Sequence, residues 1–145
     1  MKLSYNQIAK ILLASSLLFV AQSVYAGVAV ITHPDVKEIG LSKDKLAKIY
    51  LGKLKRYSNG EKIKAVDLPT SESAYQKFYK SVVKKSERAM NSHWSKLKFT
   101  GKGKPPVKLN SPSEVVKWVA SNKGAIGYID GKYLNKTVKV VLILP

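Results

Sequence analysis

The sequence has 145 residues, with 26 Lys and Arg against 9 Asp and Glu, no Cys, and a formal net charge of +17. A chain of this length has room for one domain, and without Cys it holds no disulfide, no thiolate metal site and no Cys nucleophile. An apolar fraction of 45% is typical of a globular domain and too high for a disordered chain.

Residues 1–26 have the pattern of a cleavable secretory signal. Two Lys residues precede or flank an apolar run from Ile11 to Ala21, and a V-Y-A processing pattern ends at Ala26. We therefore predict a signal peptide cleaved after Ala26 and a single periplasmic domain over 27–145. The alternative is an uncleaved N-terminal anchor. No later stretch approaches the roughly 20 apolar residues of a membrane span, so we expect none after cleavage.

The first third of the predicted domain indicates a strand, a helix and a strand. The β-branched run Val28–Ile31 predicts a buried strand followed by a turn. Ser42 is placed to cap a helix that Gly52 ends. Ile63–Leu68 then predicts a second short strand, which Pro69 ends.

Three helices are predicted in the middle of the chain. The first begins near Thr70, and the others begin at Ser86 and at a capping box of Ser111 and Glu114, with Gly124 ending the third. The apolar residues at helical spacing are Tyr75, Phe78, Tyr79, Val82 and Val83 in the first helix, Met90, Trp94 and Leu97 in the second, and Val115, Trp118 and Val119 in the third. The Gly-, Lys- and Pro-rich segment 100–110 between the last two is expected to be a surface loop.

Two strands complete the predicted domain. Ala125–Ile129 forms one, a turn at Asp130-Gly131 follows, and Val138–Leu144 forms the closing strand. The order β-α-β-α-α-α-β-β predicts an α/β domain with helices packed on a small mixed sheet. If the closing strand is outermost, its apolar edge offers a pairing surface for a homodimer.

Catalytic and metal-binding patterns are weak. His33 and His93 lack metal-ligand spacing, so we interpret them as a turn residue and a helix-surface residue rather than as ligands. The acidic residues form no local pair, and Gly101-Lys102-Gly103-Lys104 lacks the spacing of a phosphate loop, which favours a flexible basic loop. We predict no enzyme, no metal site and no cofactor.

The excess of Lys predicts anionic partners, because it creates a positive field around the domain. Nucleic acid is not expected, since the chain is predicted to be exported and its aromatic residues have core spacing. The alternative is that most lysines are merely solvated.

One local site is the turn before the first of the three helices. Free N–H groups, the positive helix end and the hydroxyls of Thr70, Ser71 and Ser73 converge there. Ordinary capping by Thr70 or Ser71 is the simpler interpretation of these residues alone, and Glu72 would repel an anion.

Several stretches resemble the substrate-binding component of phosphate ABC transporters, in the second half of that two-domain periplasmic fold. I-Y-L-G-K at 49–53 and G-A-I-G-Y at 124–128 are the most specific. The resemblance implies one lobe of a type 2 periplasmic-binding-protein fold and a periplasmic protein of the substrate-binding type. It further implies phosphate or another oxyanion as ligand, at Thr70, Ser71 and Ser73, and an ABC transporter or envelope protein as partner.

The sequence also departs from that family. Leu68 and Pro69 stand where the family's R-x-D-x-S-G-T pattern has Arg, Leu109–Pro112 replaces a G-K-G-N stretch, and only one lobe is matched. We therefore expect weak oxyanion binding or an accessory part in phosphate uptake or sensing. The alternative is a non-catalytic interaction module whose lysines bind a protein partner or an anionic envelope polymer. An exposed Ser-rich turn would favour the first, and a broad apolar or basic face elsewhere the second.

Overall fold

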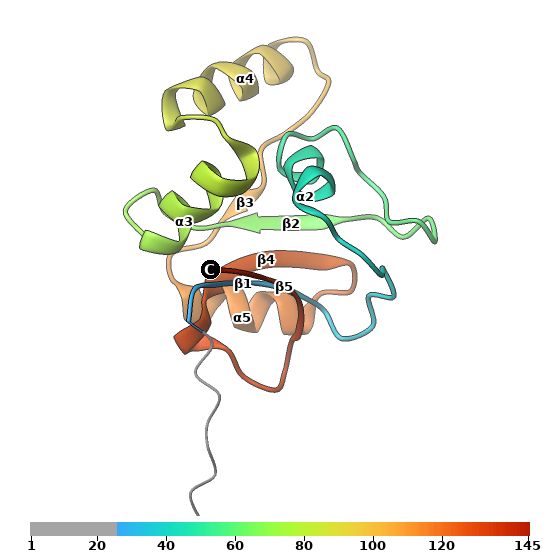
Figure 1. Ribbon diagram of the computed structural model, residues 1–145. Helices are drawn as coiled ribbons and strands as arrows, with labels where there is room; N and C mark the ends of the chain where they lie inside the picture. The colour runs from blue at the N-terminus through green and yellow to red at the C-terminus, as the bar shows by residue number, and fades with distance from the viewer. Residues whose placement is uncertain (1–25) are drawn as a thin grey trace, which may run out of the picture.

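A computed structural model describes residues 26–145 (Figure 1). The signal peptide expected over 1–26 lies outside the described residues except for Ala26. In chain order the elements are β1 (Val28–Thr32), α2 (Lys43–Tyr50), β2 (Lys64–Asp67), α3 (Ser73–Phe78), the π-helical turn η1 (Tyr79–Val83), α4 (Glu87–Phe99), β3 (Val107–Lys108), α5 (Pro112–Ser121), β4 (Ala125–Asp130), the 3₁₀ turn η2 (Gly131–Tyr133) and β5 (Lys139–Leu144). Within this part of the chain no helix has the length and apolar character needed to cross a membrane.

The five strands form one mixed sheet in the order β3-β2-β4-β1-β5. β2 is parallel to both β3 and β4, whereas β1 is antiparallel to both β4 and β5. Val28 of β1 pairs with Asp130 on one side and with Leu144 on the other. All residues of β1 are buried, and β5 forms an outer edge. The predicted α/β domain with a small mixed sheet is confirmed.

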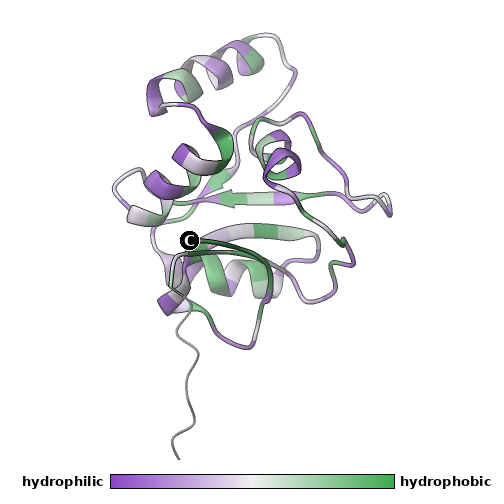
Figure 2. Cartoon of the chain, in the orientation of Figure 1, coloured by the Kyte–Doolittle hydropathy of each residue, from purple (hydrophilic) through white to green (hydrophobic). Residues whose placement is uncertain are grey.

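Helices cover both faces of this sheet. α5 packs on one face, against β4 and β1, while α2, α3 and η1 lie on the other, and α4 stands farther from the sheet (Figure 1). The packing of α5 is close because β4 has Gly127 beneath it. A Cβ atom on this glycine would lie 2.9 Å from a methyl carbon of Val115 and 3.4 Å from one of Val119. Hydrophobic colour is concentrated in the strands, whereas α3 and α4 carry hydrophilic turns (Figure 2).

Three predicted helix starts are confirmed by their caps. The hydroxyls of Ser42, Ser86 and Ser111 accept hydrogen bonds from N–H groups three residues later, at 3.1 to 3.2 Å. These bonds satisfy donors that a helix cannot pair internally. α3 differs, because it begins at Ser73 rather than near Thr70.

Other differences from the sequence predictions have local causes. β3 lies within the expected loop, where only two residues pair with β2. α5 ends at Ser121, before the predicted stop at Gly124, because Asn122 is extended and its side chain donates to the carbonyl of Trp118 at 2.8 Å. Trp118 itself is half-buried rather than a core residue.

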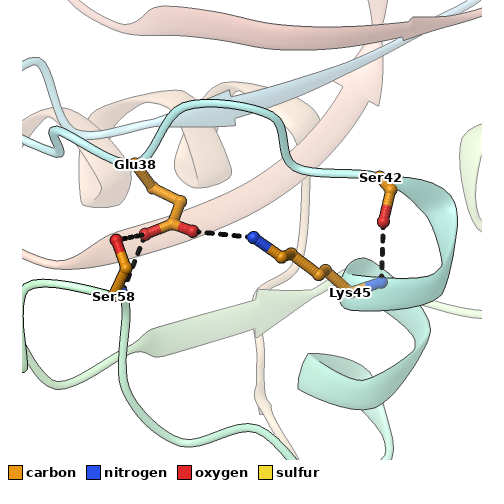
Figure 3. Close-up of polar contacts among 4 residues, drawn as sticks. All are labelled: Glu38, Ser42, Lys45 and Ser58. Atoms are coloured by element: carbon orange, nitrogen blue, oxygen red, sulfur yellow. Dashed lines mark hydrogen bonds and ion pairs between the residues drawn. The ribbon is translucent and has the colours of Figure 1, made fainter.

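A buried carboxylate fixes the connection between β1 and α2 (Figure 3). Glu38 Oε2 accepts hydrogen bonds from the N–H of Ser58 at 2.8 Å and from its hydroxyl at 2.6 Å. Its other oxygen accepts from Lys45 Nζ at 3.1 Å. Glu38 therefore joins the loop before α2, α2 itself and the hairpin before β2.

Candidate functional site

The candidate turn begins where β2 ends at a buried carboxylate. Asp67 is 6% exposed. Its Oδ1 accepts from the N–H of Leu68 at 2.9 Å and from the hydroxyl of Tyr128, and its Oδ2 accepts from the hydroxyl of Tyr79 at 2.5 Å. Burial raises the pKa of Asp67, while the hydrogen bonds from Tyr128 and Tyr79 act in the opposite direction. These contacts fix the direction in which the chain leaves the sheet.

Aromatic rings surround these hydrogen bonds. Phe78 stacks on Tyr128 with ring centroids 4.0 Å apart, and Tyr75 stacks on Tyr79 at 4.2 Å. The hydroxyl of Tyr50 donates to the carbonyl of Val66 at 2.8 Å. Burial also raises the pKa values of Tyr79 and Tyr128, so both hydroxyls stay protonated as donors. These contacts hold α3 and η1 against the end of β2.

The turn itself reaches the surface. The N–H of Glu72 donates to the carbonyl of Pro69 at 3.0 Å, and Glu72 is the N-terminal flanking residue of α3 in extended conformation. Because of this β-turn, the helix begins at Ser73 and not nearer to Thr70. Neither Thr70 nor Ser71 caps it, and no side chain supplies a cap. The simpler interpretation of ordinary capping is therefore wrong.

The three sequence-predicted site residues lie together in this turn. Ser71 and Ser73 are exposed, and Thr70 is half-buried, with its carbonyl accepting from the side chain of Gln76 at 2.7 Å. The first N–H groups of a helix have no partner within it. At α3 they meet no side-chain cap, so hydroxyls and N–H groups at one helix end are available to an oxyanion.

The N-terminus of α5 lies at the same edge of the sheet, but side chains of its own segment already cap it. Ser111 caps it, and the carboxylate of Glu114 accepts from the N–H of Asn110 at 3.0 Å. The N–H of Leu109 donates to the carbonyl of Asp67 at 2.9 Å. The carboxyl ends of parallel strands form this edge, where ligands of open α/β sheets bind. Of these two helix ends, that of α3 is the one without its own cap.

The candidate turn is open and has little positive charge of its own. None of the four main cavities found among residues 26–145 is lined by Thr70, Ser71 or Ser73. Glu72 is half-buried beside the hydroxyls. A bound anion would therefore remain largely in contact with water.

The two histidines form local contacts. His33 Nδ1 accepts from the N–H of Asp35 at 3.1 Å, as expected of a turn residue. His93 is half-buried, and its Nε2 donates to the carbonyl of Leu51 at 2.9 Å. Within residues 26–145 no cluster of three His, Asp or Glu side chains is suited to a metal ion.

A second feature, which the sequence analysis did not locate, is a groove lined by lysines. It consists of two adjoining cavities of about 550 and 720 Å³, which share Lys55, Gly103, Lys104 and Pro105. We call it the lysine groove, and the lysines that line it are Lys55, Lys62, Lys64, Lys98, Lys102 and Lys104. The sequence signal was the charge excess, but these residues come from separate segments that only the fold brings together.

Comparison by sequence finds no relative: neither a protein-family model nor a curated protein matches this chain. Comparison of structures does find similar folds. An ABC-type phosphate transport receptor from Vibrio cholerae matches with a TM-score of 0.64 and 21% identity over 81% of this chain and 46% of that one. PstS from Borrelia burgdorferi matches with a TM-score of 0.60 and 17% identity, over 81% and 47%.

A third similar structure, from Clostridium perfringens, is described as a phosphate ABC transporter substrate-binding protein with bound phosphate. Its TM-score is 0.64 at 23% identity, over 81% of this chain and 45% of that one. The chain thus spans about half the length of these solved proteins. The resemblance seen in the sequence is confirmed at the level of the fold, which matches about half of each of these solved proteins.

Proposed function

We propose that this chain is a non-catalytic periplasmic protein that binds phosphate or a related oxyanion weakly at Thr70, Ser71 and Ser73. The observation that carries the proposal is the uncapped start of α3, where exposed hydroxyls accompany free N–H groups. The fold supports it, because the similar structures are described as phosphate transport or phosphate-binding proteins. Asp67 would act as a positioning residue through its hydrogen bonds to the chain and to Tyr79.

Weak affinity follows from what surrounds the turn. Leu68 is buried and Pro69 carries no charge, so no guanidinium is supplied where the family pattern has Arg. The chain's two Arg residues are engaged or placed elsewhere: Arg56 donates to the carbonyl of Gly60, and Arg88 lies on α4. A single lobe offers one wall of a cleft, whereas tight ligand capture buries most of a ligand's surface. An accessory part in phosphate uptake or sensing, with an ABC transporter or envelope protein as partner, fits this affinity.

Calorimetric titration with phosphate and with sulfate tests the site. The double variant Ser71→Ala/Ser73→Ala should lose phosphate affinity by at least about tenfold, because hydrogen bonds to an ionised ligand are lost. The matched control is Ser95→Ala/Ser121→Ala, which removes two exposed hydroxyls on α4 and α5. Unchanged phosphate affinity in the first double variant, with the fold intact, would show that the turn is not the site.

The salt dependence of binding distinguishes specific recognition of phosphate from general attraction of anions to the lysines. Raising salt from 0.01 M to 0.15 M shortens the Debye length from about 30 Å to about 8 Å. Phosphate held by short hydrogen bonds should retain most of its affinity, whereas polyphosphate attracted by the lysines should lose much of its own. Equal and near-complete loss of both would argue against a specific phosphate site.

The second candidate function is an interaction module that binds a protein partner or an anionic envelope polymer. The lysine groove favours it, because this basic surface lies away from the Ser-rich turn. The two functions use different residues and can therefore be tested separately.

A further inference from the structure

We propose that the lysine groove is a docking site for an acidic peptide segment of a partner protein, one that carries an apolar side chain between carboxylates. This inference deepens the second candidate function and does not depend on the oxyanion site. The Ser-rich turn follows the carboxyl end of β2, whereas the groove is lined by Lys64 and Ala65 at the other end of that strand. In Figure 1 the head of the β2 arrow points toward α3 and away from this end.

The positive charge of the lysine groove favours a negatively charged ligand. Among the described residues, none of its six lysines forms an ion pair, and no Asp or Glu lines either cavity. All six lysines are exposed. Like charges gathered without counterions create a local positive potential that attracts and orients acidic partners.

The apolar residues that line the groove favour a ligand that also carries an apolar group. Besides its lysines, the cavity of about 550 Å³ is lined by apolar side chains: Ile49, Leu54, Ile63, Ala65, Trp94, Pro105, Pro106, Val107 and Trp118. Its volume of about 550 Å³ lies in the range of roughly 300–1,000 Å³ that ligand pockets occupy. Trp118 is half-buried and Val107 is 56% exposed, so apolar surface remains open to a ligand.

The walls are held in place without a ligand. Trp94 packs so closely on Gly52 that a Cβ atom there would lie 2.9 Å from its ring, and Gly52 also has a φ of +72°. Gly103 passes over the same ring, with its Cβ position 3.7 Å away. Lys55 Nζ donates to the carbonyl of Lys102 at 3.2 Å, which joins the two sides. A preformed groove reduces the entropy lost on binding.

These features favour a peptide over the other anionic partners. Polyphosphate or a charged envelope polymer would satisfy the lysines but would place no apolar group on the floor. A membrane surface would meet a protruding face more readily than lysines around a hollow. An acidic segment with an aromatic or branched side chain supplies both parts, with the apolar group as an anchor and the carboxylates at the rim.

Both Trp residues of the chain, Trp94 and Trp118, line this groove. Their fluorescence therefore reports binding there directly. The probe is an acetylated peptide in which a Phe-Leu pair is flanked on both sides by Glu residues, and it contains no Trp. We expect a saturable shift of Trp emission to shorter wavelength, because the anchor would exclude water from the rings. Peptides with Gln for Glu, or with Ala for Phe and Leu, should bind at least about tenfold more weakly.

The variant Lys62→Gln/Lys64→Gln/Lys104→Gln should lose at least about tenfold in affinity for the peptide. The matched control, Lys77→Gln/Lys80→Gln/Lys136→Gln, removes the same charge from exposed positions outside the groove and should lose less than about twofold. The variant Ser71→Ala/Ser73→Ala should bind the peptide normally, which keeps this test distinct from that of the oxyanion site.

Three results would overturn the proposal. The first is equal binding of the peptide that lacks the Phe-Leu anchor, or of polyphosphate, with the same Trp response. The second is an equal loss of affinity in the control triple variant, which would mean that overall charge alone attracts the peptide. The third is a Trp shift with anionic phospholipid vesicles and none with the peptide, which would identify a membrane as the partner.

Discussion

Glu38 illustrates how a single residue stabilises the fold through its charge. It accepts hydrogen bonds from Ser58 and Lys45, and its side chain is only 6% exposed. The hydrogen bond from the Ser58 hydroxyl is the largest cause that lowers the pKa of Glu38 below 4.5. A carboxylate whose pKa is lower in the folded state stabilises that state above its unfolded pKa. The stabilisation is lost as the pH falls through the folded-state pKa.

The first prediction is therefore that Glu38→Gln lowers the free energy of unfolding by about 1 kcal/mol at neutral pH. The difference from the unmodified protein should shrink as the pH falls below 4.5, the ordinary pKa of the group. Urea unfolding at several pH values measures it. Glu87→Gln, at an exposed position, is the control. A difference that stays constant down to acidic pH would show that packing, rather than charge, is involved.

At this scale the sequence identified the chemistry of the candidate site but not its exposure. Thr70, Ser71 and Ser73 were recognised as hydroxyls before a helix, and they do lie together. Their spacing allowed two outcomes: the hydroxyls could cap the helix, or they could stay free to bind an oxyanion. The β-turn from Pro69 to Glu72 determines which of the two occurs. The contacts of Asp67 could not be foreseen, since Tyr79 and Tyr128 reach it from different elements.

Among the elements, α5 and β4 show the closest packing. A Cβ atom at position 127 would also lie 3.0 Å from a methyl carbon of Val66, in addition to its contacts with α5. Such distances are too short for a methyl group in a packed core, so either the helix or the strand would have to move.

The second prediction is that Gly127→Ala lowers the free energy of unfolding by about 1–3 kcal/mol through overpacking. Gly103→Ala is the matched control, because its new Cβ atom would have ordinary contacts at 3.7 Å from Trp94 and 3.9 Å from Leu97. Thermal unfolding followed by circular dichroism measures both variants. Equal stability of Gly127→Ala and the unmodified protein would mean that α5 moves away from β4 without cost.

Helices and strands were predicted correctly where residues close in sequence determine them. The prediction failed where contacts between distant elements determine them. Caps at Ser42, Ser86 and Ser111 mark helix starts because the hydroxyl and its N–H partner lie within a few residues. β3 has only two residues, both exposed, and forms because β2 lies beside it. Trp118 has the spacing of a core residue, yet α5 places it at the lysine groove.

For the molecule as a whole, β5 leaves an apolar edge. It is the outermost strand beside β1, and Val140, Val141, Leu142 and Ile143 are only half-buried. Unpaired N–H and carbonyl groups on such an edge can pair with another strand. The net charge of +17 over the full sequence opposes the approach of two copies, and salt weakens this repulsion.

The third prediction is that the protein forms a homodimer through β5, and that the dimer fraction rises with salt. Val141→Lys should shift the equilibrium toward monomer, since Val141 lies at the irregularity in the pairing with β1 and a charge there would meet its copy. Val107→Lys on the opposite edge, at β3, is the matched control. Light scattering over a range of protein and salt concentrations measures the dimer fraction of each variant. A strictly monomeric unmodified protein at high salt would contradict the prediction.

The charge of the whole molecule was evident from composition, but its distribution was not. Counting Lys residues predicts an anionic partner without saying where that partner binds. Lys55 and Lys64 lie in the hairpin before β2 and at its first residue, whereas Lys104 lies in the loop after α4. Their convergence depends on how that loop crosses the end of β2. Only a fold can supply this information.

The placement of β1 between β4 and β5 determines the order in which the molecule can fold. β1 is the first strand of the described chain, yet both of its partners come last. Contacts between Val28 and Leu144 close a loop around nearly the whole described chain, and such closures are slow because the entropy of the intervening segment is lost first. A nascent chain can form its helices early, but β1 has no partner until β4 has been synthesised, and one side of β1 stays unpaired until β5 follows. A chain that stops before β5 would leave one side of β1 unpaired, and so remain open to proteolysis.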